Sequence, residues 1–249
     1  MNRISLTTFL LTFLAHAAYA DLRYTTHMEV RPAPGAGRDA RSAALTSMLQ
    51  TLMPPIDTRT FVSRDAARVE ILRRDAAGEI AGMVLLLRGA TQTLLDPDSH
   101  TYWLALRDSI ADAASDAEAT FRRTGEFSTL LGHQVERVAF TVSLPFPAPP
   151  PAGVPAVITL EGDLWLSSGF SSYVRAVAPL AGNMMDMLKD LPEGMVMRHV
   201  LRSADFGYEV EYVVTELIEE PLPASLFQVP DGFQEIPAPR SAGALGGPR

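Results

Sequence analysis

Alternation of apolar and polar side chains predicts β-strands along most of this chain. Residues 22–31 place Tyr24, Thr26, Met28 and Val30 on one side, which is the period-2 pattern of a half-buried strand. Comparable segments follow one another between short turns rich in Asp, Gly and Pro, as in an antiparallel meander. The further predicted strands are approximately 58–63, 68–73, 79–88, 91–95, 100–106, 125–130, 133–144, 157–167, 195–203 and 207–218.

Three segments instead repeat apolar residues every three or four positions, which is typical of helices that pack on a sheet. They are residues 39–53, 108–123 and 172–189. The chain shows no regular strand–helix–strand alternation, so a parallel sheet is not expected. We therefore predict an α+β fold: one strongly curved antiparallel sheet of about ten strands, a half-barrel, with about three helices in or over its concave face.

The two ends of the chain differ from the middle. A short basic start with Arg3, an apolar stretch over 4–18 and the small residues Ala18 and Ala20 form the pattern of a secretory signal peptide. The alternative is an uncleaved membrane anchor, but the stretch is shorter and richer in hydroxyl groups than the roughly 20 apolar residues that an anchor needs. Residues 237–249 are of low complexity, and we expect them to be disordered.

These ends predict the location and the extent of the folded part. We expect cleavage after Ala20 and export to a bacterial periplasm or the secreted space, with no transmembrane anchor in the mature protein. Residues 21–236 then form one folded domain. Within it, the proline-rich residues 145–155 are interpreted as a stiff loop between two strands, with a domain linker or a ligand for another module as alternatives.

Composition removes several classes of function. The chain has 249 residues, a net charge of −8 and no cysteine, which excludes disulfides, cysteine-ligated metals, thiol catalysis and an N-terminal lipid-modified cysteine. A sequence pI of about 5.1 argues against binding to nucleic acid, since phosphate contacts need clustered Lys and Arg. No nucleophile motif, phosphate loop or metal-ligand spacing of histidines occurs in the sequence.

The acidic pairs do not change this picture. Glu209 and Glu211 alternate with apolar residues on a predicted strand, and we interpret them as acids on its solvent face. We therefore predict no catalytic residue, no metal and no cofactor, and expect that the protein is not an enzyme.

Four motifs in the second half of the chain occur in a recognisable order. They are GEFSTLLGH at 125–133, GDLWLS at 162–167, PEGMVMR at 192–198 and PASLFQVPDGF at 223–233. This order resembles an exported bacterial family of unknown function, itself similar to the LolA/LolB lipoprotein carriers and RseB. The resemblance implies a half-barrel plugged by helices, whose cavity holds acyl chains in the lipoprotein carriers. In the last motif, we expect Phe227 and Val229 to insert into the core while 230–232 turns the chain outward.

Methionine and aromatic residues are the candidate ligand-binding groups. Methionine is flexible and polarizable, so it suits a cavity that accepts varied apolar ligands. Ordinary core packing is the alternative for all of these side chains, and thioether ligation of Cu(I) is a further alternative for the methionines. The candidates are Trp103, Trp165, Met184, Met187, Met195 and Tyr212.

The sequence thus favours a non-enzymatic periplasmic protein that binds a lipid, an acyl chain or another apolar ligand in the concave face of a half-barrel. The alternative is an envelope interaction or sensor module that has a filled core and binds a protein partner instead of a small molecule.

Overall fold

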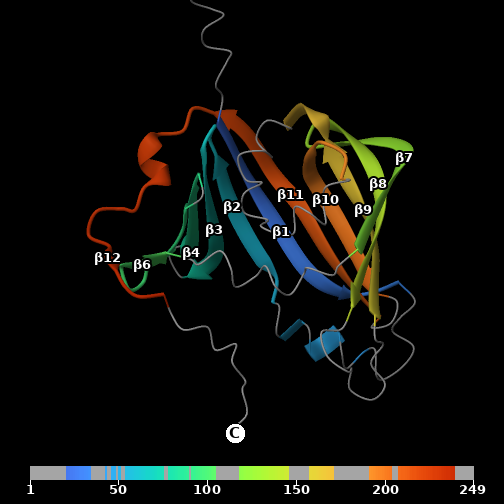
Figure 1. Cartoon of the computed structure of the whole chain (residues 1–249), viewed down its shortest axis with the longest axis horizontal. Helices are drawn as coiled ribbons and strands as arrows, with labels where there is room; N and C mark the ends of the chain where they lie inside the picture. The colour runs from blue at the N-terminus through green and yellow to red at the C-terminus, as the bar shows by residue number, and fades with distance from the viewer. Residues whose placement is uncertain are drawn as a thin grey trace, which may run out of the picture.

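The computed structural model describes residues 21–34, 43, 46–48, 50–51, 54–75, 78–89, 91–104, 118–145, 157–170, 191–203 and 207–238. In these residues one open, curved sheet of twelve strands dominates the molecule (Figure 1), in the order β12-β6-β5-β4-β3-β2-β1-β11-β10-β9-β8-β7. Neighbouring strands are antiparallel except for β12, which runs parallel to β6. The strand that comes first in the chain therefore lies in the middle of the sheet, between β2 and β11.

Among the described residues, the sheet is accompanied by the 3₁₀ helices η4 (Ser168–Phe170) and η6 (Ala224–Phe227). The strands are β1 (Asp21–Pro32), β2 (Ile56–Val62), β3 (Ala66–Asp75), β4 (Gly78–Arg88), β5 (Thr91–Asp96), β6 (Thr101–Leu104), β7 (Glu118–Leu130), β8 (His133–Pro145), β9 (Val157–Ser167), β10 (Met195–Ser203), β11 (Tyr208–Glu220) and β12 (Gln234–Glu235).

The prediction of a single curved antiparallel sheet is confirmed, but the sheet has twelve strands rather than about ten, and the described residues contain fewer helices than the three predicted. The helix predicted over 108–123 is wrong for Glu118–Arg123, which begin β7. In that part the helical stripe depended on Phe121 alone, and Phe121 instead pairs with Phe140 of β8. A long cross-strand register with β8 outweighs a weak helical period, because pairing and packing override local propensity.

The other predicted helices are described only in part. Residues 43, 46–48, 50 and 51 are helical, as predicted for 39–53. The predicted helix at 172–189, residues 108–117, most of the proline-rich loop and the tail after residue 238 lie outside the described residues. Nowhere in the described ranges is there a helix with the length and hydropathy needed to cross a membrane.

The two faces of the sheet carry different chemistry. Alternation along the strands and the pairing register place two rows of side chains on one face of the sheet. The C-terminal segment with η6 lies against the other face, outside β3 and β4 (Figure 1). We call the first face the concave face and the second the convex face. The concave rows are Trp103, Leu94, Leu85, Val69, Thr60 and Tyr24, and Ile56, Met28, Tyr212, His199, Leu164 and Val138.

The C-terminal segment covers an apolar patch on the convex face. Val229 and Phe233 pack against the buried side chains of Val84, Leu86 and Leu95. Phe227 is also buried, so the expected insertion of Phe227 and Val229 into the core is confirmed. Gly232 has a φ of +87°, which favours glycine, and the chain turns there before β12.

Candidate functional site

A cluster of aromatic and hydroxyl side chains occupies the middle of the concave face. Tyr212 of β11 stacks on His199 of β10, with ring centroids 5.0 Å apart and an interplanar angle of 11°. The two rings meet because the register pairs these residues directly across the strands. Tyr212 also forms a side-chain hydrogen bond with Thr26, whose Oγ1 lies 2.6 Å from Oγ1 of Thr58.

Tyr24 joins this cluster from β1. Its hydroxyl is hydrogen-bonded to the Thr60 side chain, and its ring packs against the same apolar core as Tyr212. The polar atoms of the cluster are therefore largely satisfied within it, as buried polar groups must be. The arrangement leaves aromatic rings, rather than unpaired polar groups, as the chemistry that this part of the face offers.

Burial shifts the pKa values of the ionisable groups in this cluster toward their neutral forms. Burial raises the pKa of the Tyr212 phenol, and the neighbouring Tyr24 raises it further, while the hydrogen bond with Thr26 opposes both. Burial likewise raises the pKa of Tyr24 and lowers the pKa of His199. Because desolvation disfavours the charged form of each group, both tyrosines and His199 are neutral at pH 7. The cluster is thus an uncharged region of low polarity.

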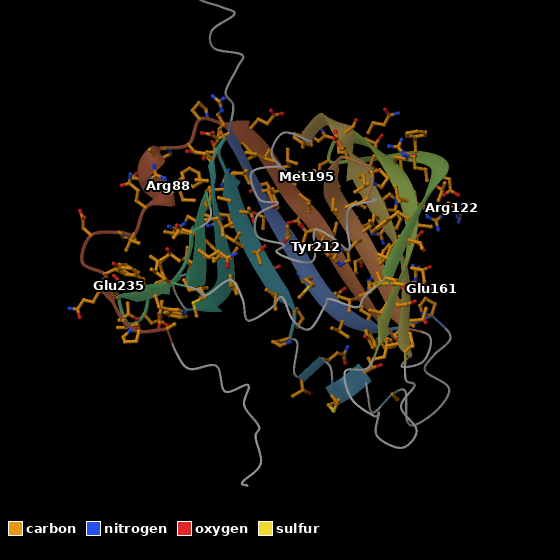
Figure 2. All side chains as sticks on the ribbon, viewed as in Figure 1. Arg88, Arg122, Glu161, Met195, Tyr212 and Glu235 are labelled. Atoms are coloured by element: carbon orange, nitrogen blue, oxygen red, sulfur yellow. The ribbon has the colours of Figure 1, made fainter. Side chains whose placement is uncertain are left out.

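The predicted ligand-binding residues are distributed unevenly. Tyr212 and Trp103 belong to the concave face, in the two rows given above. Met195 is 5% exposed and packs in a core cluster with Met197 and Phe170 (Figure 2). Trp165 is half-buried in the row of Arg198 and Arg137, and the Arg198 guanidinium lies 4.7 Å from the centroid of its ring.

Met184 and Met187 lie outside the described residues. The structure adds Tyr24, Thr26 and His199 to Tyr212, and these three residues are not among the ligand-binding candidates predicted from the sequence. The signal was present in the strand pattern, because pairing 195–203 with 207–218 as a hairpin puts His199 and Tyr212 directly opposite each other.

An arginine–carboxylate ladder crosses the convex face from β1 to β8. Glu209 accepts hydrogen bonds from Arg202 (2.8 Å) and Arg31 (3.3 Å). Glu211 binds Arg31 and Arg198. The expectation that these two glutamates lie on a solvated face was wrong, because Glu209 is only 8% exposed and arginines from both neighbouring strands cover them. The ladder consists of Arg31, Glu209, Glu211, Arg198, Arg202, Asp163 and Arg137.

Asp163 is the most buried acid at the far end of this ladder. Its carboxylate accepts hydrogen bonds from Arg137 Nε at 2.8 Å and from Arg202 at 3.2 Å. Burial alone would raise the pKa of this carboxyl, but the two arginines outweigh it and hold the pKa below its ordinary value. Arg137 in turn binds the exposed Glu126 of β7 at 2.8 Å. The ladder therefore ties β11, β10, β9, β8 and β7 together through charge-assisted hydrogen bonds.

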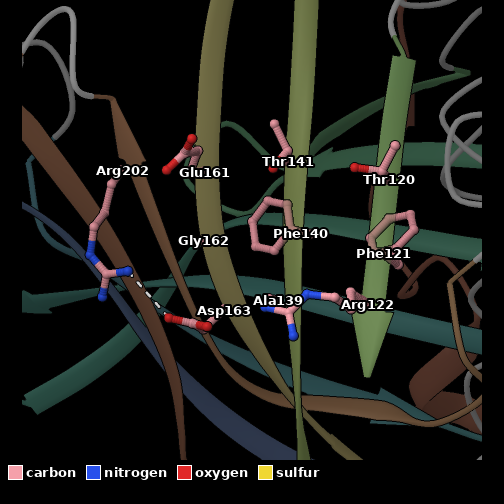
Figure 3. A pocket seen from close by; sticks show the side chains of 10 residues that line it. All are labelled: Thr120, Phe121, Arg122, Ala139, Phe140, Thr141, Glu161, Gly162, Asp163 and Arg202. Carbon is pink, nitrogen blue, oxygen red and sulfur yellow. Dashed lines mark hydrogen bonds and ion pairs between the residues drawn. The ribbon is translucent and has the colours of Figure 1, made fainter. Parts of the chain in front are cut away.

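A polar hollow of about 440 Å³ lies between this ladder and β7 (Figure 3). Ala139 has a small side chain on the convex face at this point, and the charged groups of Arg122, Glu161, Asp163 and Arg202 surround it. The hollow is unsuited to an acyl chain because positively and negatively charged side chains line it. The lining residues are Thr120, Phe121, Arg122, Ala139, Phe140, Thr141, Glu161, Gly162, Asp163 and Arg202. Within the described ranges, no group of three His, Asp or Glu residues converges as a metal site.

A small pH dependence is expected from His27 on the convex face. Its Nδ1 lies 2.7 Å from Asp57, and this hydrogen bond, with smaller contributions from Glu29, raises the pKa of His27. A raised pKa in the folded state gives a stabilisation that is fully present below the unfolded value of about 6.5 and is lost as the pH rises through the folded value. The unfolding midpoint of the wild type should therefore fall between about pH 6 and pH 8 by more than that of His27→Gln.

Thermal unfolding at several pH values tests this expectation. Asp57→Asn removes the partner and should reduce the pH dependence in the same way. An unchanged slope in both variants would contradict the role given to His27.

Comparison with known proteins gives structural similarity only. No protein-family model and no curated protein matches the chain. An uncharacterized conserved protein from Thermus thermophilus is similar over 94% of this chain and 99% of its own, at 9% identity and a TM-score of 0.46. Lipoprotein LppX from Mycobacterium tuberculosis is similar over 88% of this chain and 96% of its own, at 10% identity and a TM-score of 0.34.

A protein from Vibrio parahaemolyticus, described as an outer membrane lipoprotein-sorting domain, is similar over 84% of this chain and 89% of its own, at 9% identity and a TM-score of 0.34. At such low identities and TM-scores, a ligand has to be argued from the residues of this chain.

Proposed function

We propose that this protein is an exported, non-enzymatic carrier that binds a lipid or acyl chain on the concave face of its sheet. The signal-peptide pattern of residues 1–20 supports export. The ligand would lie against the uncharged cluster around Tyr212 and extend toward Trp103, with the predicted methionines Met184 and Met187 contributing from residues 172–189. Affinity would come from burial of apolar area, at about 25 cal/mol per Å².

The observation that carries this proposal is the separation of chemistry between the two faces. Charged side chains are concentrated on the convex face, where carboxylates and arginines satisfy one another. The concave rows hold aromatic and aliphatic side chains with a few satisfied hydroxyls. Ligand sites for apolar molecules have this composition: mostly apolar walls with a small number of placed polar groups.

One observation favours the alternative of an interaction or sensor module with a filled core. Met195 and Met197 are 5% and 0% exposed, so this end of the sheet is filled by the protein's own side chains. If the same holds along the whole concave face, no room remains for a ligand, and the protein would act through its outer surface.

The two tryptophans allow a direct test of the proposed site. Bromine on an acyl chain quenches tryptophan fluorescence at contact. We expect a brominated fatty acid to quench the fluorescence of the Trp165→Phe variant, which retains Trp103 in the concave row. The Trp103→Phe variant retains Trp165, which packs against the same core cluster as Tyr212 and reports on that end of the site. Native mass spectrometry of protein purified from a bacterial periplasm without detergent should also show a co-purifying lipid.

A second variant tests the contribution of the cluster. Tyr212→Ala removes roughly 60 Å² of aromatic contact, which should weaken binding of the fatty acid about tenfold. Phe127→Ala is the matched control, since Phe127 is 62% exposed on β7 and outside the concave cluster. A protein without bound lipid that shows no quenching with added fatty acids or phospholipids would overturn the carrier proposal and favour a protein partner.

A further inference from the structure

The two edge strands of the sheet differ in length. At one edge, the short strand β12 from the C-terminal segment pairs with β6, through Gln234 and Glu235. At the other edge, β7 has 13 residues and no strand beyond it among the described residues (Figure 1). Its residues from Glu118 to Arg123 form a regular ladder with β8 on one side only. A long edge strand with free backbone groups is a template for pairing with another strand.

The exposed side chains of β7 have a self-complementary charge pattern. Glu118, Thr120 and Arg122 alternate along the strand, so they lie on the same face, and each is exposed. In the part of the chain that the structure describes, neither Glu118 nor Arg122 has an ion-pair partner. The adjacent Arg123 differs, because it lies 3.1 Å from Glu136 of β8.

We infer that β7 pairs antiparallel with β7 of a second copy of this chain, about a two-fold axis that passes at Thr120. In this register Glu118 lies opposite Arg122 of the second copy, and Arg122 lies opposite its Glu118. Side chains directly opposite in an antiparallel pair have Cβ atoms about 4.5–5.5 Å apart. This is within reach of an ion pair once the Arg122 guanidinium, which lies beside Ala139 in the hollow (Figure 3), turns toward the free edge. The dimer joins two twelve-stranded sheets into one continuous sheet.

Symmetry and charge together select this register. A two-fold axis perpendicular to the sheet keeps the faces of both copies aligned, so only registers in steps of two residues are allowed. Sliding the second copy by one such step places Arg122 opposite its Thr120, so that neither Arg122 nor Glu118 lies opposite a charge of the other sign. Moving a second step places the two Arg122 side chains opposite each other. On the other side of the sheet, the chosen register packs Phe121 against Ala119 of the second copy.

The interface is short, which sets the expected strength. The register between β7 and β8 shifts between Arg123 and Phe127, so the regular part of the edge ends there. About five residues from each copy pair, and interfaces of this size are weak. The dimer should therefore form reversibly at micromolar concentrations and dissociate as salt screens the two ion pairs.

Charge reversal tests this inference with an internal rescue. Sedimentation velocity of the purified protein over a concentration series up to about 100 µM should show a monomer–dimer equilibrium. Arg122→Glu and Glu118→Arg should each weaken the dimer about tenfold or more, because both cross-strand pairs become repulsive. The double variant Glu118→Arg/Arg122→Glu should restore the wild-type constant. Arg88→Glu, on the far side of the sheet from Arg122 (Figure 2), is the matched control and should have no effect.

Cross-linking tests the register itself. The chain contains no cysteine, so a single introduced thiol reports only on its own position. Thr120→Cys should form a disulfide-linked dimer under mild oxidation, since the two thiols face each other at the axis. Ser128→Cys, exposed on the same strand beyond the register shift, should not.

A monomer at every concentration would overturn the inference. A dimer that is insensitive to Arg122→Glu, or one that the double variant fails to restore, would also overturn it, because association would then use another surface. Binding of the brominated fatty acid is measured independently, so loss of the dimer and loss of the proposed ligand are distinguishable.

Discussion

Gly162→Ala should destabilise the protein by about 3 kcal/mol, because an alanine methyl group has no space at this position. A Cβ built on Gly162 overlaps the backbone carbonyl oxygen of Val200 and lies 2.7 Å from a ring carbon of Phe140. The carbonyl belongs to the neighbouring strand β10, so it cannot move without disturbing the ladder between β9 and β10. The Phe140 ring lies across β9 at this residue and stacks on Phe121, with ring centroids 6.3 Å apart.

Urea unfolding followed by circular dichroism measures this effect, with Gly169→Ala as the matched control. Gly169 follows the same strand and has only the Ser167 hydroxyl oxygen, at 3.9 Å, near its virtual Cβ. The control variant should unfold within about 0.5 kcal/mol of the wild type, as is usual for substitutions without a steric conflict. Equal midpoints for Gly162→Ala and the wild type would show that β9 and β10 can separate freely, contrary to the packing described.

Asp163→Asn should cost about 2–3 kcal/mol at pH 7, because it leaves two arginines facing a neutral amide. Arg137 and Arg202 both donate to this carboxylate, which is 6% exposed as a residue. The lowered pKa of Asp163 adds a pH signature. The stabilisation is present above the unfolded pKa of about 3.9 and is lost as the pH falls through the lower folded value.

The free energies of unfolding of Asp163→Asn and the wild type should therefore differ at pH 7 and converge as the pH falls below the lowered pKa of Asp163. Glu126→Gln is the control, since Glu126 binds the same Arg137 at 2.8 Å but its side chain is 64% exposed. An exposed pair of this kind contributes about 0–1 kcal/mol. If the two variants lose the same free energy of unfolding, burial of Asp163 is not what makes the ladder important.

The strand pattern of this chain was sufficient to predict the sheet, and the reason lies in its turns. Sequences such as Asp96-Pro97-Asp98-Ser99 have strong local turn chemistry, and the Asp96 carboxylate does accept hydrogen bonds from Asp98 and Ser99. The beginning of β7 is not predicted from the sequence because Phe121 fits both a helical stripe and a strand alternation. Only the partner strand β8 resolves this ambiguity, and that partner is a long-range feature.

The functional site could be predicted less well than the fold. Tyr212 was selected for its residue type, but its neighbours His199 and Thr26 come from strands on either side of β11. The sequence assigns Glu209 and Glu211 of the convex ladder to solvent because they alternate with apolar residues, as solvated acids do. Their burial depends on arginines that lie up to 180 positions away in sequence. Periodicity reports which face a side chain occupies, whereas its surroundings depend on the order of strands in the sheet.

The central place of β1 has a consequence for the order in which the chain folds. Its register joins Asp21 to Glu220 and Pro32 to Tyr208, so its two ladders close at very different times as the chain emerges from its N- to its C-terminus. The ladder with β2 can form early, because Met28 and Ile56 are close in sequence. The ladder with β11 must wait for nearly the whole chain, which leaves one long edge of β1 unpaired until then. Contacts of such large sequence separation make folding slow, and during that interval the chain needs a holding factor or a rapid collapse of β2–β6 to stay out of intermolecular pairing.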